Sequence, residues 1–171
     1  MVIVSFVGEM ATGKTAIANM LALENDGVVL SFATPLKNIA KDVYKMKYKD
    51  RDLLQILGEA MRSVRPSVFL DYTKDEIQKA VGDGRNVYID DCRYRNELEM
   101  LKGLGSRIVR LRSSEATRCS RLRINGLDLT GTEHVSETEM VSFDENDFDM
   151  VLYNDNGVTL ERAVNLVNAI I

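Results

Sequence analysis

The chain has 171 residues, of which 45% are hydrophobic and 28% charged, and its formal net charge is −4. This length suits one domain with a substantial core, and the acidic balance gives no bulk attraction to nucleic acid or to anionic lipid. Two cysteines make no disulfide framework, no apolar run approaches the roughly 20 residues of a membrane span, and no basic leader precedes the first apolar run, so we expect a cytoplasmic protein with no membrane partner.

Apolar runs alternate with segments of helical spacing along the chain. Strands are predicted at 2–7, 28–32, 86–90, 107–111 and 148–153, and helices at 16–24, 36–44, 53–61, 67–81, 94–102, 114–122 and 159–170. Thr34 is the expected N-cap of the second helix, ahead of Pro35. Strands separated by helices predict an α/β fold, a five-stranded parallel sheet flanked by helices, within a single domain spanning 1–171. The polar, aperiodic segment 125–147 is predicted to be a lid or binding loop.

Residues 8–15, GEMATGKT, fit the phosphate-binding pattern G-x-x-x-x-G-K-[ST]. They lie between a predicted strand and a predicted helix, where loop N–H groups and the helix N-terminus favour a polyphosphate. Lys14 is expected to reach the β- and γ-phosphates of ATP, and Thr15 to ligate Mg²⁺. The loop residues expected to bind the nucleotide are Gly8, Ala11, Thr12, Gly13, Lys14 and Thr15.

Two acids, Asp90 and Asp91, end the third predicted strand. The carboxyl ends of parallel strands face the ligand crevice, so a carboxylate there suits the Mg²⁺ environment or the positioning of a nucleophile. Asp91 is the candidate for both roles, and an N-cap of the following helix is the structural alternative. Arg93 lies beside the same crevice, where a second phosphate would bind.

Six arginines and a single acid lie between positions 107 and 123. Arg118 and Arg121 are three residues apart on one predicted helix and share a face. Guanidinium groups beside a mobile loop suit phosphoryl transfer, so both are candidate catalytic residues; a solvated helix paired with acids of 125–147 is the alternative. His134, the single histidine, is interpreted as a structural or lid residue.

Several motifs together resemble the bacteriophage-type deoxynucleoside monophosphate kinases. Residues 91–97, DCRYRNE, are similar to that family's D-x-R-x-x-N-E signature, and residues 54–62, LQILGEAMR, to its L-Q-x-x-G-x-x-x-R helix. Further similarities follow at 31–37, 134–137 and 154–157, so the resemblance covers nearly the whole chain. Tyr94-Arg95 departs from the family, which often has an aromatic residue followed by proline there.

The resemblance implies phosphoryl transfer from ATP, with Mg²⁺, to a deoxynucleoside 5′-monophosphate. A monophosphate-binding region would span about 33–82 and a lid about 113–140. Arg118 and Arg121 would close on the transferred phosphoryl group, with Arg118 also binding the nucleotide, and Asn156 and Gly157 would line the adenine side. The acceptor would be bound by Phe32, Lys37, Arg62, Asp91, Arg93 and Asn96.

Three other functions stay open. The first is a kinase acting on a modified pyrimidine nucleotide such as 5-hydroxymethyluracil, free or within DNA, although the net charge disfavours a nucleic-acid partner. The second is a small-metabolite kinase of the shikimate or gluconate type. The third is a nucleotide-binding module with negligible transfer, against which the arginine clusters argue. The accepted base and the oligomeric state, including a homodimer, stay open as well.

Overall fold

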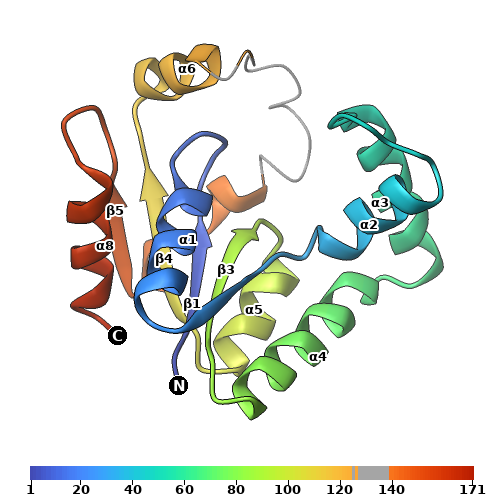
Figure 1. Ribbon diagram of the computed structural model, residues 1–171, viewed down its shortest axis with the longest axis horizontal. Helices are drawn as coiled ribbons and strands as arrows, with labels where there is room; N and C mark the ends of the chain where they lie inside the picture. Colours follow the sequence, from blue (N-terminus) through green and yellow to red (C-terminus); the bar gives the residue numbers. More distant parts are fainter. Residues whose placement is uncertain (125, 127–138) are drawn as a thin grey trace.

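A five-stranded parallel sheet with strand order β2-β3-β1-β4-β5 forms the centre of the protein (Figure 1). The computed structural model describes residues 1–124, 126 and 139–171. The central strand β1 pairs with β3 on one side and with β4 on the other. This arrangement confirms the predicted fold class. The strands are β1 (Ile3–Val7), β2 (Gly27–Leu30), β3 (Asn86–Cys92), β4 (Arg107–Arg112) and β5 (Met150–Tyr153).

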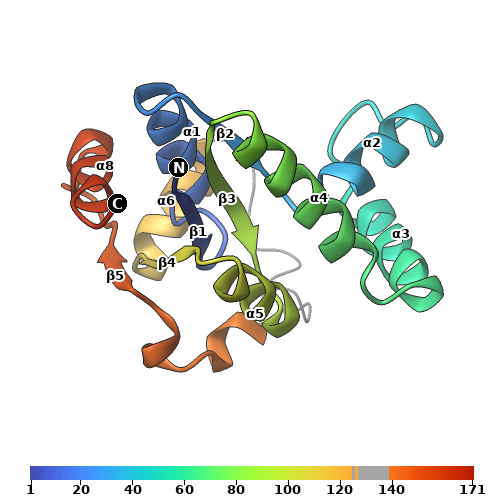
Figure 2. The same ribbon diagram turned by 90° about the horizontal axis from the view of Figure 1, so that it is seen from below.

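Helices cover both faces of the sheet (Figure 2). On one face lie α1 (Lys14–Glu24), which packs over β1, β2 and β3, and beside it α8 (Leu160–Asn168); on the other lie α4 (Val68–Gly82) and α5 (Arg95–Gly103). Side chains alternate along each strand, so Tyr88 of β3 is buried under α1 whereas its neighbours Val87 and Ile89 are buried under α4 and α5. Both faces of the strands are therefore apolar, as a parallel sheet requires.

Two further helices, α2 (Thr34–Asp42) and α3 (Arg51–Val64), extend beyond the sheet beside α4, within the region predicted to bind the acceptor (Figure 1). Strand β2 ends two residues earlier than predicted because Phe32 and Ala33 turn to donate their backbone N–H groups to Asp91, at 2.8 and 3.1 Å. The prediction of Thr34 as N-cap was wrong. The N-cap is Ala33, with no side-chain cap of its own, so the Asp91 carboxylate serves the start of α2.

Residues 139–147, which were predicted to be loop, contain two 3₁₀ turns, Glu139–Ser142 and Glu145–Asp147. Met140 and Phe143 are 1% and 5% exposed and belong to the core on the α4 and α5 face. Three apolar residues among six polar ones give no periodicity, so the sequence did not reveal this packing. Residues 125 and 127–138 of the predicted lid loop, including His134, lie outside the described residues.

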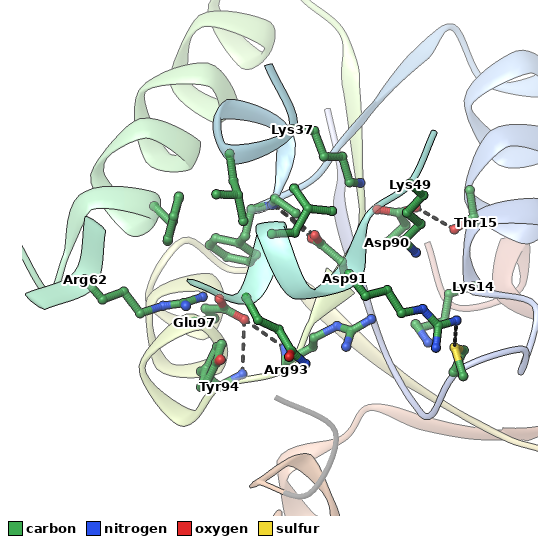
Figure 3. Close-up of a pocket in the computed structure, with 18 of the residues that line it drawn as sticks. Lys14, Thr15, Lys37, Lys49, Arg62, Asp90, Asp91, Arg93, Tyr94 and Glu97 are labelled. Carbon is green, nitrogen blue, oxygen red and sulfur yellow. Dashed lines mark hydrogen bonds between the residues drawn. The ribbon is translucent and has the colours of Figure 1, made fainter. Parts of the chain in front are cut away.

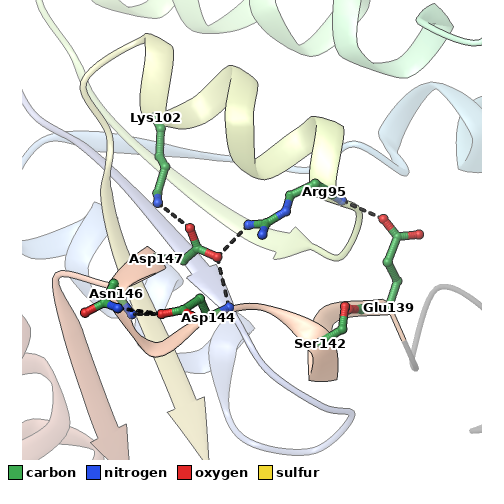
Figure 4. Close-up of polar contacts among 7 residues, drawn as sticks. All are labelled: Arg95, Lys102, Glu139, Ser142, Asp144, Asn146 and Asp147. Carbon is green, nitrogen blue, oxygen red and sulfur yellow. Dashed lines mark hydrogen bonds and ion pairs between the residues drawn. The ribbon is translucent and has the colours of Figure 1, made fainter.

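Polar contacts attach this segment to α5 (Figure 4). The carboxylate of Glu139 accepts a hydrogen bond from the backbone N–H of Arg95 at 2.8 Å, at the first turn of the helix. Asp147 forms ion pairs with Arg95 and with Lys102, the latter at 2.7 Å. The last part of the predicted lid loop is therefore held to the helix that begins beside Arg93.

Helix α6 (Glu115–Ile124) lies at the carboxyl ends of the strands (Figure 1). Both cysteines, Cys92 and Cys119, are free thiols. Of the helices that the structure describes, none combines the length and the apolar character that crossing a membrane requires.

Candidate active site

The phosphate-binding loop between β1 and α1 has a backbone that only glycine accommodates at two places. A Cβ atom on Gly8 would lie 2.4 Å from the carbonyl oxygen of Leu111, and Gly13, at φ +101°, would place one 2.5 Å from Nδ2 of Asn154. Gly13 is also the N-cap of α1, so the N–H groups of the first helical turn are available to an anion. The loop has the form that its motif predicts.

Lys14 lies across this loop. Its ammonium group donates hydrogen bonds to the carbonyl oxygens of Gly8 and Glu9 at 2.5 and 2.8 Å, and the residue is 8% exposed. A compact charge held at the loop by two neutral carbonyls can exchange them for phosphate oxygens, which bind an ammonium more strongly. This placement supports the predicted role of Lys14.

Thr15 and the end of β3 meet beside the loop. The Thr15 hydroxyl donates a hydrogen bond to Oδ2 of Asp90 at 2.6 Å, whereas Asp91 accepts from Ser31, Phe32 and Ala33 at the start of α2. The two carboxylates lie where the pairing of β1 with β3 shifts register, and they point to different elements. The carboxylate beside Thr15 is therefore Asp90, and not Asp91 as the sequence suggested.

A hydroxyl and a carboxylate are the hard oxygen ligands that Mg²⁺ prefers, and a Mg²⁺ ion that also binds phosphates commonly needs only one or two protein ligands. Burial raises the pKa of Asp90, and the nearby Asp91 raises it further, while the hydrogen bond from Thr15 and the charges of Lys37 and Lys14 oppose this. A cation would relieve the first two effects. Thr15 and Asp90 thus fit a magnesium ion.

A cavity of about 360 Å³ extends from Lys14 and Thr15 to α2, α3 and the turn between β3 and α5 (Figure 3). Two further cationic side chains, Lys49 and Arg51, line it. Asn96, also predicted to bind the acceptor, is exposed and is not part of the lining. The structure does bring together the other residues predicted on this side, which are Phe32, Lys37, Arg62, Asp91 and Arg93.

Arg62 is held between two aromatic rings within this cavity. Its guanidinium carbon lies 4.8 Å from the ring centroid of Phe69 and 4.6 Å from that of Tyr94, distances at which cation–π attraction is effective. Tyr94 keeps the aromatic residue of the family's aromatic–proline pair, and Arg95 stands in place of the proline. The ring of Tyr94 gives Arg62 a fixed direction before any ligand binds.

Glu97 is a residue of this cavity that the sequence reasoning missed. It is 3% exposed and accepts hydrogen bonds at Oε2 from the backbone N–H groups of Arg93 and Tyr94, at 2.8 and 3.1 Å. Its position as the last residue of the D-x-R-x-x-N-E pattern was the available signal. Nothing in the sequence distinguished it from exposed Asn96, because burial follows from how α5 packs.

The two candidate arginines of α6 contact the phosphate-binding loop. Arg118 forms an ion pair with Glu9 at 3.0 Å, and Arg121 donates to the carbonyl oxygens of Ala11 at 3.1 Å and Asn154 at 2.8 Å. These contacts place both guanidinium groups next to the loop and join it to the end of β5. Their closure on a transferred phosphoryl group stays a prediction.

Asn154 is a second residue that the sequence reasoning missed. It is 7% exposed, and its amide donates to the carbonyl oxygen of Thr12 at 2.8 Å. Asn156 and Gly157, predicted for the adenine side, are exposed in the turn that follows and do not line the cavity. Asp155 accepts from the backbone N–H of Ser114 at 2.7 Å, which attaches this turn to the start of α6.

No protein-family model matches the chain, and neither does any curated protein. Several solved structures share its fold over almost the whole length. The tunicamycin resistance protein of Deinococcus radiodurans is 17% identical with a TM-score of 0.63, covering 98% of this chain and 94% of its own. The shikimate kinase of Bacteroides thetaiotaomicron is 14% identical with a TM-score of 0.57, covering 99% and 97%.

A sugar kinase from Janibacter sp. HTCC2649 is similar to the same degree, at 16% identity and a TM-score of 0.58, covering 99% of this chain and 93% of its own. Identities this low establish the fold alone. The chain therefore has the α/β fold of P-loop kinases, in agreement with its phosphate-binding loop.

Proposed function

We propose that this protein transfers a phosphoryl group from ATP to a small anionic acceptor. The observation that carries the proposal is that one cavity joins the phosphate-binding loop to a second set of cations. Lys14 and Thr15 line it beside the loop, and Arg62 on α3 and Arg93 on the turn after β3 line it farther from the loop's lysine. Phosphoryl transfer depends on positioning two substrates and neutralising the charge between them, and this arrangement supports both.

The donor side is formed by the loop, Lys14, Thr15 and Asp90. Magnesium held by Thr15 and Asp90 would neutralise phosphate charge when ATP is bound. Lys14 stabilises charge on the donor phosphates, and Lys37, which also lines the cavity, lies close enough to Asp90 to lower its pKa. Arg118 and Arg121 hold the loop in place.

We further propose that the acceptor is a deoxynucleoside 5′-monophosphate. Arg62 and Arg93 provide guanidinium groups for its phosphate, and the aromatic and aliphatic lining provides an apolar wall for its base. The family resemblance of residues 54–62 and 91–97 supports the same acceptor. The apolar lining consists of Phe32, Leu36, Leu54 and Phe69.

A small-metabolite acceptor is the second candidate, because the fold is shared with a shikimate kinase and with a gluconokinase from Sinorhizobium meliloti. Cationic side chains bind a carboxylate as well as a phosphate, so charge alone does not separate the two classes. The apolar wall favours the nucleotide.

A coupled ADP-release assay with Mg²⁺ and ATP tests the proposal. The acceptors are dTMP, dGMP, dCMP, dAMP, dUMP, 5-hydroxymethyl-dUMP and the corresponding ribonucleotides, with shikimate, gluconate and a duplex containing 5-hydroxymethyluracil as alternatives. Lys14→Ala provides the background rate. ADP release that depends on an acceptor and occurs only with monophosphates supports the nucleotide assignment. ADP release with shikimate or gluconate would instead assign a small-metabolite acceptor. If none of the acceptors causes ADP release, transferase function is contradicted.

A further inference from the structure

Glu97 is a buried carboxyl group on the acceptor side of the cavity (Figure 3). It lies in the first turn of α5, and its Oε2 atom is occupied by the backbone N–H groups of Arg93 and Tyr94. Two donors on one oxygen fix the plane of the group, so its second oxygen, Oε1, points in a constant direction.

Oε1 faces the cavity. None of the described residues donates a hydrogen bond to Oε1, and yet Oε1 is not among the fully buried polar atoms that lack a partner. The atom is therefore accessible from the cavity. Figure 3 shows the side chain of Arg62 extending toward the carboxyl group of Glu97, and its positive charge acts on that group electrostatically. An oxyanion bound by Arg62 would therefore also come within reach of Oε1.

The groups around Glu97 decide its protonation state. Burial raises the pKa of Glu97 to about 8, and the negative charge of Asp91 on β3 acts in the same direction. The backbone N–H groups of Arg93 and Tyr94 and the charge of Arg62 on α3 oppose this. A further neighbour, the buried thiol of Cys92, has a pKa raised well above its usual value and stays neutral. At pH 7 the favoured form of Glu97 is the uncharged acid.

We propose that Glu97 binds the anionic group of the acceptor as a neutral carboxylic acid, donating a hydrogen bond from Oε1 beside Arg62. A neutral acid adds a donor without adding a second negative charge, whereas an ionised Glu97 would repel the ligand and compete with it for Arg62. The ligand class is an oxyanion, phosphate or carboxylate. Its identity as the acceptor rests on the proposed kinase function, but its binding does not.

Glu97→Gln tests this proposal, because the amide keeps a carbonyl oxygen for the two backbone N–H groups and places a permanent donor at the position of Oε1. The exposed Glu99→Gln, two residues along the same helix, is the matched control. The probe is inorganic phosphate, titrated by calorimetry from pH 6.5 to 9.5 into protein saturated with Mg²⁺ and a non-hydrolysable ATP analogue, so that the donor phosphate positions are filled.

If phosphate binds the protein only when Glu97 is protonated, the phosphate affinity is highest below the pKa of Glu97 and falls above it. For a pKa of about 8, wild type and Glu99→Gln should bind phosphate about tenfold or more weakly at pH 9.5 than at pH 7. Glu97→Gln should lose this dependence. Equal pH dependence in wild type and Glu97→Gln, or no dependence in wild type, would overturn the proposal.

Should Glu97→Gln fail to fold, the ¹³C carboxyl resonance of Glu97 in the wild-type protein decides the matter. Phosphate must raise the pH at which this resonance titrates, and an unchanged or lowered titration refutes the proposal. The experiments also distinguish this inference from the proposed kinase function. If phosphate binding depends on the protonation of Glu97 but no acceptor causes ADP release, this inference stands and the kinase function is rejected. If an acceptor causes ADP release but phosphate binding has the same pH dependence in wild type and Glu97→Gln, the kinase function stands and this inference is rejected.

Discussion

The hydroxyl of Thr15 donates a hydrogen bond to the carboxylate of Asp90 at 2.6 Å, joining the first turn of α1 to the end of β3. One residue comes from a helix and the other from a strand 75 positions along the chain, yet they place two side-chain oxygen atoms together near Lys14. The next residue, Asp91, serves the start of α2. Two adjacent carboxylates therefore have different partners, one at the phosphate-binding loop and one at the start of α2.

Asp90→Asn should lower kcat by at least about a hundredfold and raise the Mg²⁺ concentration needed for half-maximal rate. The amide still accepts the Thr15 hydrogen bond but is a poor ligand for Mg²⁺, and removing one group of a preorganised electrostatic site commonly costs two to three orders of magnitude. ADP release measured over a range of Mg²⁺ concentrations gives the result.

Asp91→Asn is the matched comparison. It should lower the melting temperature, because a neutral amide oxygen accepts the backbone N–H groups of Phe32 and Ala33 less strongly, at a cost of about 1 kcal/mol. Its Mg²⁺ dependence should match wild type. If Asp91→Asn changes the Mg²⁺ requirement and Asp90→Asn does not, the metal position belongs to Asp91.

Lys14→Ala should reduce kcat by far more than tenfold, a factor that corresponds to about 1.4 kcal/mol, while the melting temperature changes little. The exposed Lys41→Ala on α2 is the control for loss of one positive charge. The comparison is made with the favoured acceptor at saturating ATP and Mg²⁺. If Lys14→Ala keeps more than a tenth of the wild-type rate, the phosphate-binding loop does not contribute to catalysis as proposed.

Arg62→Lys should raise the acceptor KM by about tenfold and change the ATP KM by less than about twofold. Lysine lacks the planar fork that binds two oxyanion oxygens and the flat surface that lies between Phe69 and Tyr94. The exposed Arg65→Lys, at the end of the same helix, should alter neither constant. A rise confined to the ATP KM would place Arg62 on the donor side.

Residue types and spacing were enough to predict the parallel sheet, the order of its helices and the phosphate-binding loop, because local periodicity and a contiguous motif encode them. The choice between Asp90 and Asp91 was not encoded in this way. It depends on where each side chain points at a place where the pairing of β1 with β3 shifts register, between the pair Ser5 and Ile89 and the pair Val7 and Cys92, and this irregularity arises between distant segments.

Residues brought together by packing were the hardest to find. Asn154 reaches Thr12 only because β5 lies beside β4, and Glu97 becomes buried only because α5 packs against the sheet. Phe143 was missed for a related reason: its cover comes from α5, with Arg95 5.3 Å above its ring, and not from neighbours in the sequence.

Asp147→Asn should destabilise the protein at neutral pH by about 1 kcal/mol or less, because it removes ion pairs that are partly open to solvent. The hydrogen bond from Lys102 lowers the pKa of Asp147 to about 2, with Arg95 adding to the effect and burial opposing it. A lowered folded-state pKa stabilises above the unfolded value, near 4, and the stabilisation disappears as the pH falls toward 2.

The difference between wild type and Asp147→Asn in urea unfolding should therefore be greatest above about pH 4 and shrink below it. The exposed Asp75→Asn on α4 controls for loss of one carboxylate. A difference that stays constant from pH 6 to pH 2.5 would show that Asp147 stabilises through packing and not through its charge.

Gly13→Ala should destabilise the protein by about 1–3 kcal/mol and weaken ATP binding. The backbone at this position has φ +101°, which disfavours any residue with a Cβ, and that atom would lie 2.5 Å from Nδ2 of Asn154. Asn154 cannot simply rotate away, because it is 7% exposed and its amide is bonded to Thr12. Adding Asn154→Ala should relieve the collision but not the backbone strain, so the double variant recovers only part of the loss.

Gly82→Ala, with nothing within 4 Å of its Cβ position at the end of α4, should be neutral or stabilising by up to about 1 kcal/mol. Thermal unfolding with and without ATP compares the three. If Gly13→Ala matches Gly82→Ala in melting temperature and ATP affinity, the loop is flexible enough to accept a side chain and its preorganisation does not contribute to phosphate binding.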